Sequence, residues 1–564
     1  MKRRLLATIL SCIMITAYAG CGTAGVNERA DSSQNEEGGF IPSEEVLNSS
    51  EVVISQEQDS EAEGGFDVSG IDTSEHVVIT YLTIGDKPEG KAADRLRETM
   101  AELNEKLNDE LNAELNIEFI EWDNYLSDYN KKLALKDGSV DLVGASTDWL
   151  EGWSNAKKGV FLPLSIGILE KYAPKTYGSV TSEHWDMCKY DGKIYFMPED
   201  NYTQWTNHGF IYRKDFAKEA GLREGINSWE ELTTYFWYVR NNHPELKCPW
   251  DSDGTNFDDM TQGWIQSHSD YVAIDGLGSA KLWCGTKEDP YTIHVPIMED
   301  TDMFVEYASL MKKWDSMGVW TSNVMNNAGA DNRKEYREGL VAAEEHHTQT
   351  FANLCSNNEE NMIYKNNPEA ESDFFYFGKE TGNIVTDTIT HGAMAVSAGS
   401  KNPERALMVY DMLRNDKACY SLICYGIEGI SYVINEEGLR AKPEGFDAEN
   451  DSVYSMTNFW WGRNDDLEIR DAEINWDIVD ELYTTYDKKK IEYPYGQFVP
   501  DESEFEAKKE KCNEIYEKYM KEISYGKYDG TAEGAVSRLQ SELALEGIDD
   551  VTMALQEQID ALYR

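Results

Sequence analysis

Hydrophobic and polar positions follow two different periods in the first part of the folded sequence. Residues 76–86 form an apolar run that ends in Gly-Asp, which predicts a strand leading into a loop. Apolar side chains then recur every three or four positions from Leu96 to Leu111, which predicts an amphipathic helix. Strands are also expected at 116–122 and 141–143. Strands that alternate with helices predict an α/β fold with mostly parallel sheets flanked by helices.

Further along the chain, the pattern predicts a crossing between two lobes and several more helices. An apolar segment ending at Pro198 and another at 209–212 flank a polar, aromatic stretch, which we interpret as the crossing segment. Ser228 and Glu231 have the spacing of a capping box at a helix start. Asn402, followed by proline, predicts another helix start, and the C-terminal region has the apolar faces of helices.

The N-terminal residues have the pattern of a bacterial export signal. Basic residues at 2–4 precede an apolar run at 5–18, which is shorter than the roughly 20 residues that a membrane-spanning helix needs. Two small residues then precede Cys21, as in a lipobox. We expect residues 1–20 to be a lipoprotein signal peptide and Cys21 to be acylated. A plain secreted protein cleaved nearby is the alternative.

The next segment, 21–75, is rich in Ser, Glu, Gly, Asp and Asn. Such a sequence buries too little apolar surface to offset the entropy of ordering it, so we expect a disordered tether. The folded part would then be held at the extracytoplasmic face of a cell membrane.

Size and charge narrow the possibilities further. The rest of the chain exceeds one ordinary hydrophobic core, so two lobes or domains are expected. The formal net charge is −52, from 52 basic and 104 acidic residues. This acidity argues against nucleic acids and anionic membrane surfaces as partners. The acidic composition is explained by the need for solubility outside the cell. It does not imply that the ligand is a cation.

The cysteines do not form an evident disulfide framework. Nine are present, of which Cys12 and Cys21 lie in the export region. The remaining odd, scattered set favours free buried thiols, although a pair between Cys419 and Cys424 stays open. No CxxC pair occurs, which argues against a structural zinc site. The scattered set is Cys188, Cys248, Cys284, Cys355, Cys419, Cys424 and Cys512.

Several segments follow one another from about residue 76 to the end, among them KKGVFLPLS (157–165), DGKIYFMPE (191–199) and GFIYRKDF (209–216). Their order resembles the extracellular solute-binding lipoproteins of carbohydrate ABC importers, of the family 1 type. Residues 393–438, which contain the sequence YGIEG, look like a Gram-positive oligosaccharide-binding subgroup with a characteristic C-terminal domain.

The resemblance implies a two-lobed, periplasmic-binding-protein-like fold with a largely helical C-terminal region. Lobe 1 is expected at 76–200, completed by about 376–415, and lobe 2 at 201–375, completed by about 416–564. The implied function is non-catalytic capture of a carbohydrate, an oligosaccharide, between the lobes and its delivery to the permease subunits of an ABC transporter. The resemblance also implies a monomer without a cofactor. It does not indicate which sugar is bound.

Sugar chemistry selects the candidate site residues. A sugar presents C–H groups on its faces and hydroxyls at its rim, which aromatic platforms and a few polar groups recognise. In parallel sheets ligands bind outside the carboxyl ends of strands, where Trp122 and Trp149 are expected. Core packing, hinge packing or solvation is the alternative for each residue. The candidates are Trp122, Asp123, Trp149, Asp200, Tyr202, Trp205, Asn207, Trp264, His346, Trp460 and Trp461.

Metal and catalytic motifs are weak. His346 and His347 lack the i, i+4 spacing of a helical zinc motif, so no metal ligand is predicted there. Residues 251–260 are rich in Asp, but Gly254 comes two positions too early for a calcium loop, and bound calcium stays open. No nucleotide-binding, serine-hydrolase or zinc-protease motif occurs. A surface glycoside hydrolase and a sugar sensor for a two-component system remain the alternatives.

Overall fold

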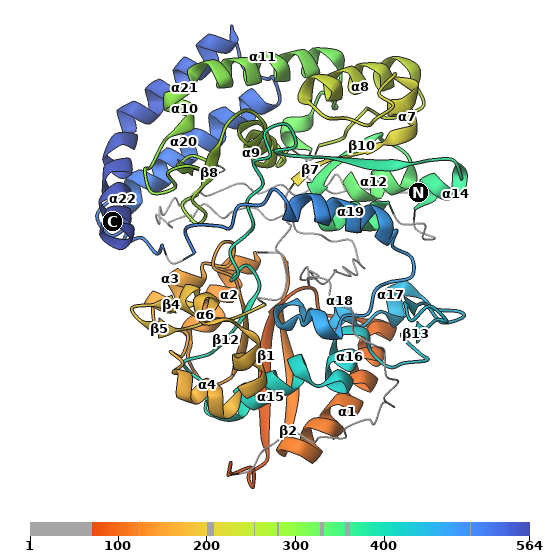
Figure 1. Ribbon diagram of the computed structural model, residues 1–564, viewed down its shortest axis with the longest axis vertical. Helices are drawn as coiled ribbons and strands as arrows, with labels where there is room; N and C mark the ends of the chain where they lie inside the picture. Colours follow the sequence, from red (N-terminus) through yellow and green to blue (C-terminus); the bar gives the residue numbers. More distant parts are fainter. Residues whose placement is uncertain are drawn as a thin grey trace, which may run out of the picture.

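The computed structural model describes residues 70–122, 124–199, 208–252, 254–278, 281–327, 332–355, 361–496 and 498–564. This part of the chain forms two lobes, which lie one above the other in Figure 1. The two-lobed α/β fold expected from the sequence is therefore confirmed. The predicted signal peptide, tether and acylated Cys21 lie outside the described residues. No helix among the described residues is long and apolar enough to cross a membrane.

Lobe 1, the lower lobe in Figure 1, is built on a five-stranded sheet of order β2-β1-β3-β12-β6. β1 runs parallel to β2 and to β3, whereas β12 is antiparallel to β3 and β6. The strands are β1 (Val77–Ile84), β2 (Ala113–Ile120), β3 (Leu142–Ala145), β6 (Met197–Pro198) and β12 (Ala393–Val396), and short pairs are formed by β4 (Lys189–Tyr190) with β5 (Lys193–Ile194) and by β13 (Val433–Ile434) with β14 (Arg440–Ala441).

Helices cover the sheet of lobe 1 with amphipathic faces. In α1 the buried leucines Leu103, Leu107 and Leu111 recur at intervals of four, so one stripe of the helix packs on the core. The helices are α1 (Gly90–Leu111), α2 (Tyr125–Ala134), α3 (Gly152–Lys157), α4 (Ile166–Tyr172), α5 (Pro174–Ser179), α6 (Ser182–Met187), α15 (Pro403–Asn415), α16 (Lys417–Tyr425), α17 (Ala448–Asp451) and α18 (Tyr454–Thr457), with 3₁₀ turns η2 (Trp460–Gly462) and η3 (Asp465–Leu467).

Lobe 2 is built around β7 (His208–Arg213), with β10 (Ala343–His347) and β11 (Ser372–Tyr376) on either side. Both neighbours are antiparallel to β7, so the expectation of a mostly parallel sheet fails in this lobe. β7 leads away from the edge at which the chain arrives from lobe 1, and β10 and β11 return to that edge. Phe210 packs in one core cluster and Ile211 in another, which places a core on each face of the sheet.

The helices of lobe 2 include the predicted one that begins after Ser228. The Ser228 hydroxyl accepts a hydrogen bond from the Glu231 amide at 3.1 Å, and the Glu231 carboxylate accepts one from the Asn227 amide at 2.7 Å. The helices are α7 (Lys214–Glu219), α8 (Trp229–Asn242), α9 (Phe257–His268), α10 (Pro296–Glu299), α11 (Thr301–Met317), α12 (Asn332–Glu338), α13 (Thr348–Leu354), α14 (Met362–Asn366), α19 (Trp476–Asp487), α20 (Glu506–Ser524), α21 (Ala532–Glu546) and α22 (Ile548–Tyr563), with η1 (Val324–Asn326) and strands β8 (Tyr271–Ala273) and β9 (Cys284–Thr286).

The chain leaves lobe 1 for the last time later than the sequence suggested. Residues from about 416 onward were expected in lobe 2, but Cys419, Ile423 and Trp461 are buried in the core of lobe 1. The apolar side of α16 packs against α1 and α15 of that lobe. Lobe 2 is completed from α19 onward, and α20, α21 and α22 share its main core.

The cysteines agree with the expectation of free thiols. All seven in the described part of the chain are buried and lie outside any disulfide, including Cys419 and Cys424, which both lie on α16. The disulfide left open between these two is therefore not formed.

Candidate functional site

Three tryptophans form a continuous stacked layer in lobe 1. The rings of Trp122 and Trp149 are 6.3 Å apart between centroids with planes inclined by 22°. Trp149 stacks in turn on Trp461, at 5.5 Å and 21°. Tyr125 lies against Trp122 and Trp149, and Trp460 contacts Trp461. Four of the predicted site residues are thus brought together, although they come from positions far apart in the sequence.

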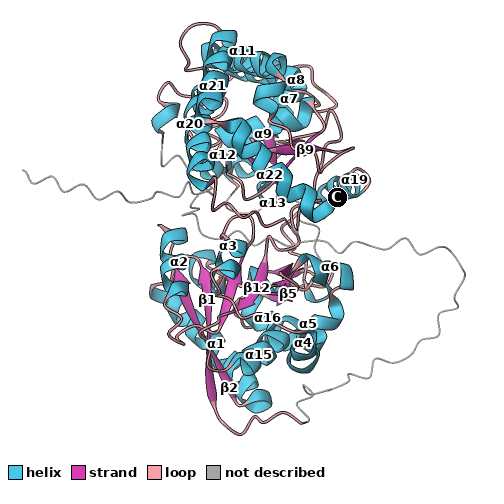
Figure 2. Ribbon diagram, turned by 90° about the vertical axis from the view of Figure 1, so that its left-hand side faces the viewer, coloured by secondary structure: helices cyan, strands magenta, loops and turns pink. Residues whose placement is uncertain are grey.

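The layer lies at the carboxyl ends of three neighbouring strands. Trp122 follows the end of β2, and Trp149 follows the end of β3. Trp461 is tied to β1, because its indole N–H donates to the Thr83 hydroxyl at 3.0 Å. The helices that follow β2 and β3, α2 and α3, lie on the side of lobe 1 that faces lobe 2 (Figure 2). The layer is therefore on the side where α/β proteins bind their ligands.

Burial divides the layer into a base and an accessible edge. Trp461 is fully buried, and a side chain at Gly144 would overlap its ring, with the nearest atom at 2.4 Å. Trp149 is 8% exposed, and its indole N–H has no hydrogen-bond partner among the described residues. Trp122 and Trp460 are half-buried. Trp122 and Trp460 can therefore present ring surface, while Trp461 supports the layer from below.

Trp264 occupies a different environment from the other candidate tryptophans. It lies on α9 in the core of lobe 2, where it is 5% exposed. Its indole N–H donates to the carbonyl of Met303 at 3.0 Å, and its ring stacks on His268 at 3.5 Å. These contacts give Trp264 the core-packing role that stood as its alternative.

His346 lies at the end of β10, where the strand reaches the edge of the lobe 2 sheet nearest the crossing. Its Nδ1 accepts a hydrogen bond from the His347 amide at 2.9 Å, so the ring proton is on Nε2. His347 is held similarly, because its Nδ1 accepts from the Thr350 amide at 3.2 Å and caps α13. Both rings are thus oriented as hydrogen-bond donors through Nε2.

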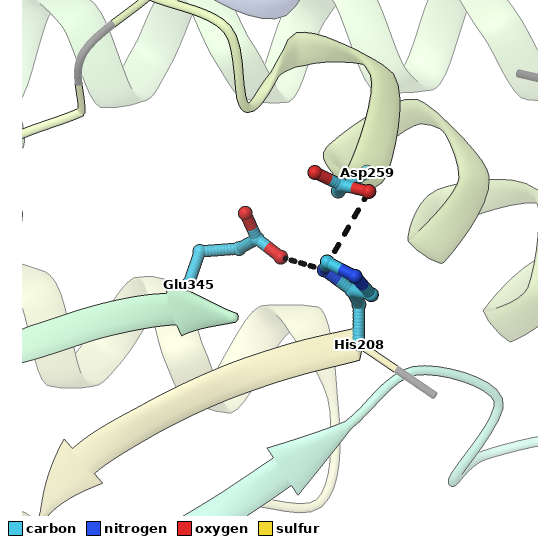
Figure 3. A group of neighbouring side chains, drawn as sticks. All are labelled: His208, Asp259 and Glu345. Carbon is cyan, nitrogen blue, oxygen red and sulfur yellow. Dashed lines mark hydrogen bonds and ion pairs between the residues drawn. The ribbon is translucent and has the colours of Figure 1, made fainter. Parts of the chain in front are cut away.

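A cluster that sequence reasoning missed lies beside these histidines. Nδ1 of His208 is 2.9 Å from a carboxylate oxygen of Glu345 and 3.5 Å from one of Asp259 (Figure 3). His208 begins β7, Glu345 belongs to β10, and Asp259 is in the first turn of α9. Donor atoms of the three side chains all lie within 4.8 Å of one another. We call these residues the His208 cluster.

Comparison with known proteins identifies the family. The model of the bacterial extracellular solute-binding proteins matches residues 93–418, which is more than half of the chain. The chain belongs to this family. A domain of unknown function matches residues 494–564, where α20, α21 and α22 complete lobe 2. A comparison with curated proteins found no match.

Solved structures support the same fold for this extracellular solute-binding protein. It is similar to the N-glycan transport solute-binding protein NgtS of Streptococcus pneumoniae, at 17% identity and a TM-score of 0.60, covering 86% of this chain and 99% of NgtS. The alginate-binding protein AlgQ2 gives 14% identity and 0.57 over the same shares. A solute-binding protein of Bifidobacterium longum infantis, described as binding HMO, gives 11% and 0.59, also over 86% and 99%.

In this solute-binding protein, one buried arginine holds the chain just before the first crossing between lobes. Arg414 on α15 is fully buried and donates to the carbonyls of Pro198 at 2.7 Å and Glu199 at 2.8 Å. The start of the crossing is therefore attached to the core of lobe 1. The remaining candidate residues, Asp123, Asp200, Tyr202, Trp205 and Asn207, lie outside the described residues.

Proposed function

We propose that this extracellular solute-binding protein captures a carbohydrate, an oligosaccharide, between its two lobes and delivers it unchanged to the permease of an ABC transporter. We further propose that acylated Cys21 and the segment 21–75 attach it to the membrane of a Gram-positive bacterium. We also propose that the protein belongs to the oligosaccharide-binding subgroup that the sequence YGIEG indicates.

The aromatic layer of Trp122, Trp149 and Trp461 carries the carbohydrate proposal. Flat aromatic surfaces suit the C–H faces of sugar rings, and they offer little to an amino acid or an inorganic ion. Within and beside this layer, Trp122 and Trp460 are half-buried and present ring surface, while Trp149 and Trp461 lie buried behind them. The buried, unpaired indole N–H of Trp149 adds a donor for a sugar hydroxyl or a bridging water.

The structural neighbours point in the same direction. NgtS structures contain Man1GlcNAc and Man5GlcNAc, and the latter matches with a TM-score of 0.55 at 16% identity. The described fold of this chain has two lobes, and the aromatic layer lies at the carboxyl ends of the lobe 1 strands, on the side toward lobe 2 (Figure 2). Because the identities are low, the neighbours support the class of solute and leave the individual glycan to experiment.

A thermal-shift screen tests the proposal directly. The purified chain is heated with a panel of oligosaccharides, monosaccharides, amino acids and short peptides, and the glycans are analysed afterwards. A ligand that binds only the native state stabilises it by about 2.7 kcal/mol at a hundredfold excess over Kd. We expect a shift with one glycan family and unchanged glycan. A shift with peptides alone would overturn the carbohydrate proposal, and glycan breakdown would indicate a hydrolase.

A further inference from the structure

We propose that the His208 cluster is a binding site for a divalent transition metal of the zinc type. Imidazole nitrogen and carboxylate oxygen are the zinc ligands found in proteins besides thiolate, with bonds of about 2.0–2.2 Å. Ligand atoms bound at those lengths are about 3.0 to 3.4 Å apart in octahedral or tetrahedral geometry. Nδ1 of His208 is 2.9 Å from Glu345 and 3.5 Å from Asp259, which is close to this spacing, and all three donor atoms lie within 4.8 Å of one another.

The register of the lobe 2 sheet explains why the ligands converge. His208 pairs with His347, and Glu345 pairs with Phe210. Side chains two positions apart along a strand share a face, so His208 and Glu345 are diagonal neighbours on the face that α9 covers. The first turn of α9 then brings Asp259 to the same nitrogen from a different direction, as Figure 3 shows.

A chain of buried polar contacts fixes the orientation of Glu345. Its carboxylate is fully buried and accepts a hydrogen bond from the Asn256 amide group. The Asn256 side chain accepts a hydrogen bond from the Ser252 hydroxyl at 2.7 Å, and Ser252 is in turn 2.7 Å from the hydroxyl of Tyr525. Supporting contacts of this kind orient metal ligands and raise metal affinity. Glu345 is therefore held in place before any ion arrives.

Access and charge also fit a bound cation. His208 and Asp259 keep 24% and 27% of their side-chain surface exposed, so an ion can enter and retain a water or another ligand. Two carboxylates around one imidazole leave net negative charge, whether the ring is neutral or protonated, and a divalent ion would balance it. Calcium fits less well, because it takes six to eight oxygen ligands. Two carboxylates and one nitrogen favour the smaller, borderline metals.

Another histidine in the same lobe provides the contrast. His243 also lies between two carboxylates, with Glu219 at 3.4 Å and Glu245 at 3.1 Å. These two carboxylates approach opposite ring nitrogens, Nε2 and Nδ1, so they cannot share one ion with the ring. His243 and His208 each have two carboxylates nearby. The difference is that both carboxylates of the His208 cluster approach the same ring nitrogen.

Metal binding by the purified chain tests the proposal. The protein is stripped with EDTA, titrated with Zn²⁺ by calorimetry in 150 mM salt, and analysed for metal after dialysis. We expect one tightly held Zn²⁺ per chain in the wild type and in His243→Gln, and its loss in His208→Gln and Asp259→Asn. Asn256→Ala should weaken binding by about 10–100-fold, since it removes a supporting contact.

The controls separate a built site from general attraction to an acidic protein. Weak binding that is equal in all variants would overturn the proposal, as would the absence of a stoichiometric ion in the wild type. Cobalt-substituted protein should show d–d absorption bands that disappear in His208→Gln, and circular dichroism checks that each variant folds. Affinity should fall at acidic pH, because protons compete for the ligands. No solute is present in these measurements, so failure here leaves the carbohydrate proposal untouched.

Discussion

At the scale of single residues, burial decides which aromatic side chains are available for a ligand. Trp122 and Trp461 belong to one stacked layer, yet Trp122 is half-buried and Trp461 is fully buried. Truncating an accessible ring removes contact area for a ligand, whereas truncating a buried ring leaves a cavity. The two ends of the same layer should therefore respond differently to the same substitution.

Trp122→Ala should weaken binding of the glycan found in the thermal-shift screen while changing stability little. Loss of an aromatic platform is expected to cost about 1–3 kcal/mol, or about 5–150-fold in Kd. Isothermal titration calorimetry measures the affinity. Trp237→Ala is the matched control, because Trp237 lies on α8 of lobe 2 and is 56% exposed. If the wild type and Trp122→Ala bound the glycan with equal affinity, the Trp122 ring would not be part of the binding site.

Trp461→Ala should act mainly on stability. Replacing a fully buried tryptophan by alanine costs about 3–5 kcal/mol, and here it also leaves the Thr83 hydroxyl without the indole donor. Urea denaturation followed by circular dichroism measures the loss. Extrapolated free energies of unfolding carry an error of about 1 kcal/mol. If the free energy of unfolding of Trp461→Ala differed from that of the wild type by no more than this error, the role of Trp461 as the base of the layer would be contradicted.

The buried cysteines give a prediction about reactivity. Burial raises the pKa of Cys512 to about 11 and those of Cys284 and Cys355 to about 12, so their thiols stay protonated at pH 8. Because the thiolate is the reactive form, native protein should resist iodoacetamide at these positions. Mass spectrometry of labelled peptides should find modification only after unfolding in guanidinium. Rapid labelling of Cys512 in native protein would contradict its burial.

Sequence reasoning found the residues of the aromatic layer and missed the His208 cluster for a physical reason. Trp122 ends the strand predicted at 116–122, and Trp149 comes shortly after the one predicted at 141–143, so local pattern is enough to place both near strand ends. His208 and Glu345 are 137 positions apart, and they meet only because of the register between β7 and β10. The visible pair at His346 and His347 drew attention instead, although backbone amides occupy the Nδ1 atoms of both rings.

At the scale of elements, the sequence predicted which segments are helices and strands better than it predicted their partners. The helix expected after Asn402 is α15, and the strand expected at 76–86 is β1. An apolar stripe indicates that one side of a helix is buried, but it does not indicate which lobe that side packs against. For that reason α16 was assigned to lobe 2, although it packs in lobe 1.

Contacts between helices supply what local sequence lacks at the start of α5. Ala173, which precedes this helix, has no side chain that can cap it. Asp411 on α15 takes that role from a distance, because its carboxylate accepts hydrogen bonds from the amides of Thr176 at 2.6 Å and Lys175 at 3.3 Å. A buried carboxylate thus joins two helices of lobe 1 by satisfying amides that the helix itself leaves free.

Asp411→Ala should therefore destabilise lobe 1 by about 1–3 kcal/mol, the cost of leaving buried donors unsatisfied. Asp411→Asn keeps one oxygen acceptor in the same position and should lose less. Thermal unfolding followed by circular dichroism compares the two variants. If both lose the same stability, the bonds to the α5 amides are not what the carboxylate contributes.

At the scale of the whole molecule, the chain passes between the lobes at several points. It crosses between β6 and β7, between β11 and β12, and between η3 and α19. Arg414 attaches the first of these segments to the core of lobe 1 at Pro198 and Glu199. Each lobe has its own core, so relative movement of the lobes disturbs the crossings and leaves the cores intact.

Capture of a solute between the lobes should therefore change the dimensions of the protein without unfolding either lobe. A ligand that contacts both lobes favours the closed arrangement by its difference in affinity for the two states. Small-angle X-ray scattering should show a smaller radius of gyration at saturating glycan. Trp122→Ala, measured at the same glycan concentration, should keep the larger radius until more ligand is added. An unchanged radius at proven saturation would mean that the lobes are already closed, or that the glycan binds to one lobe alone.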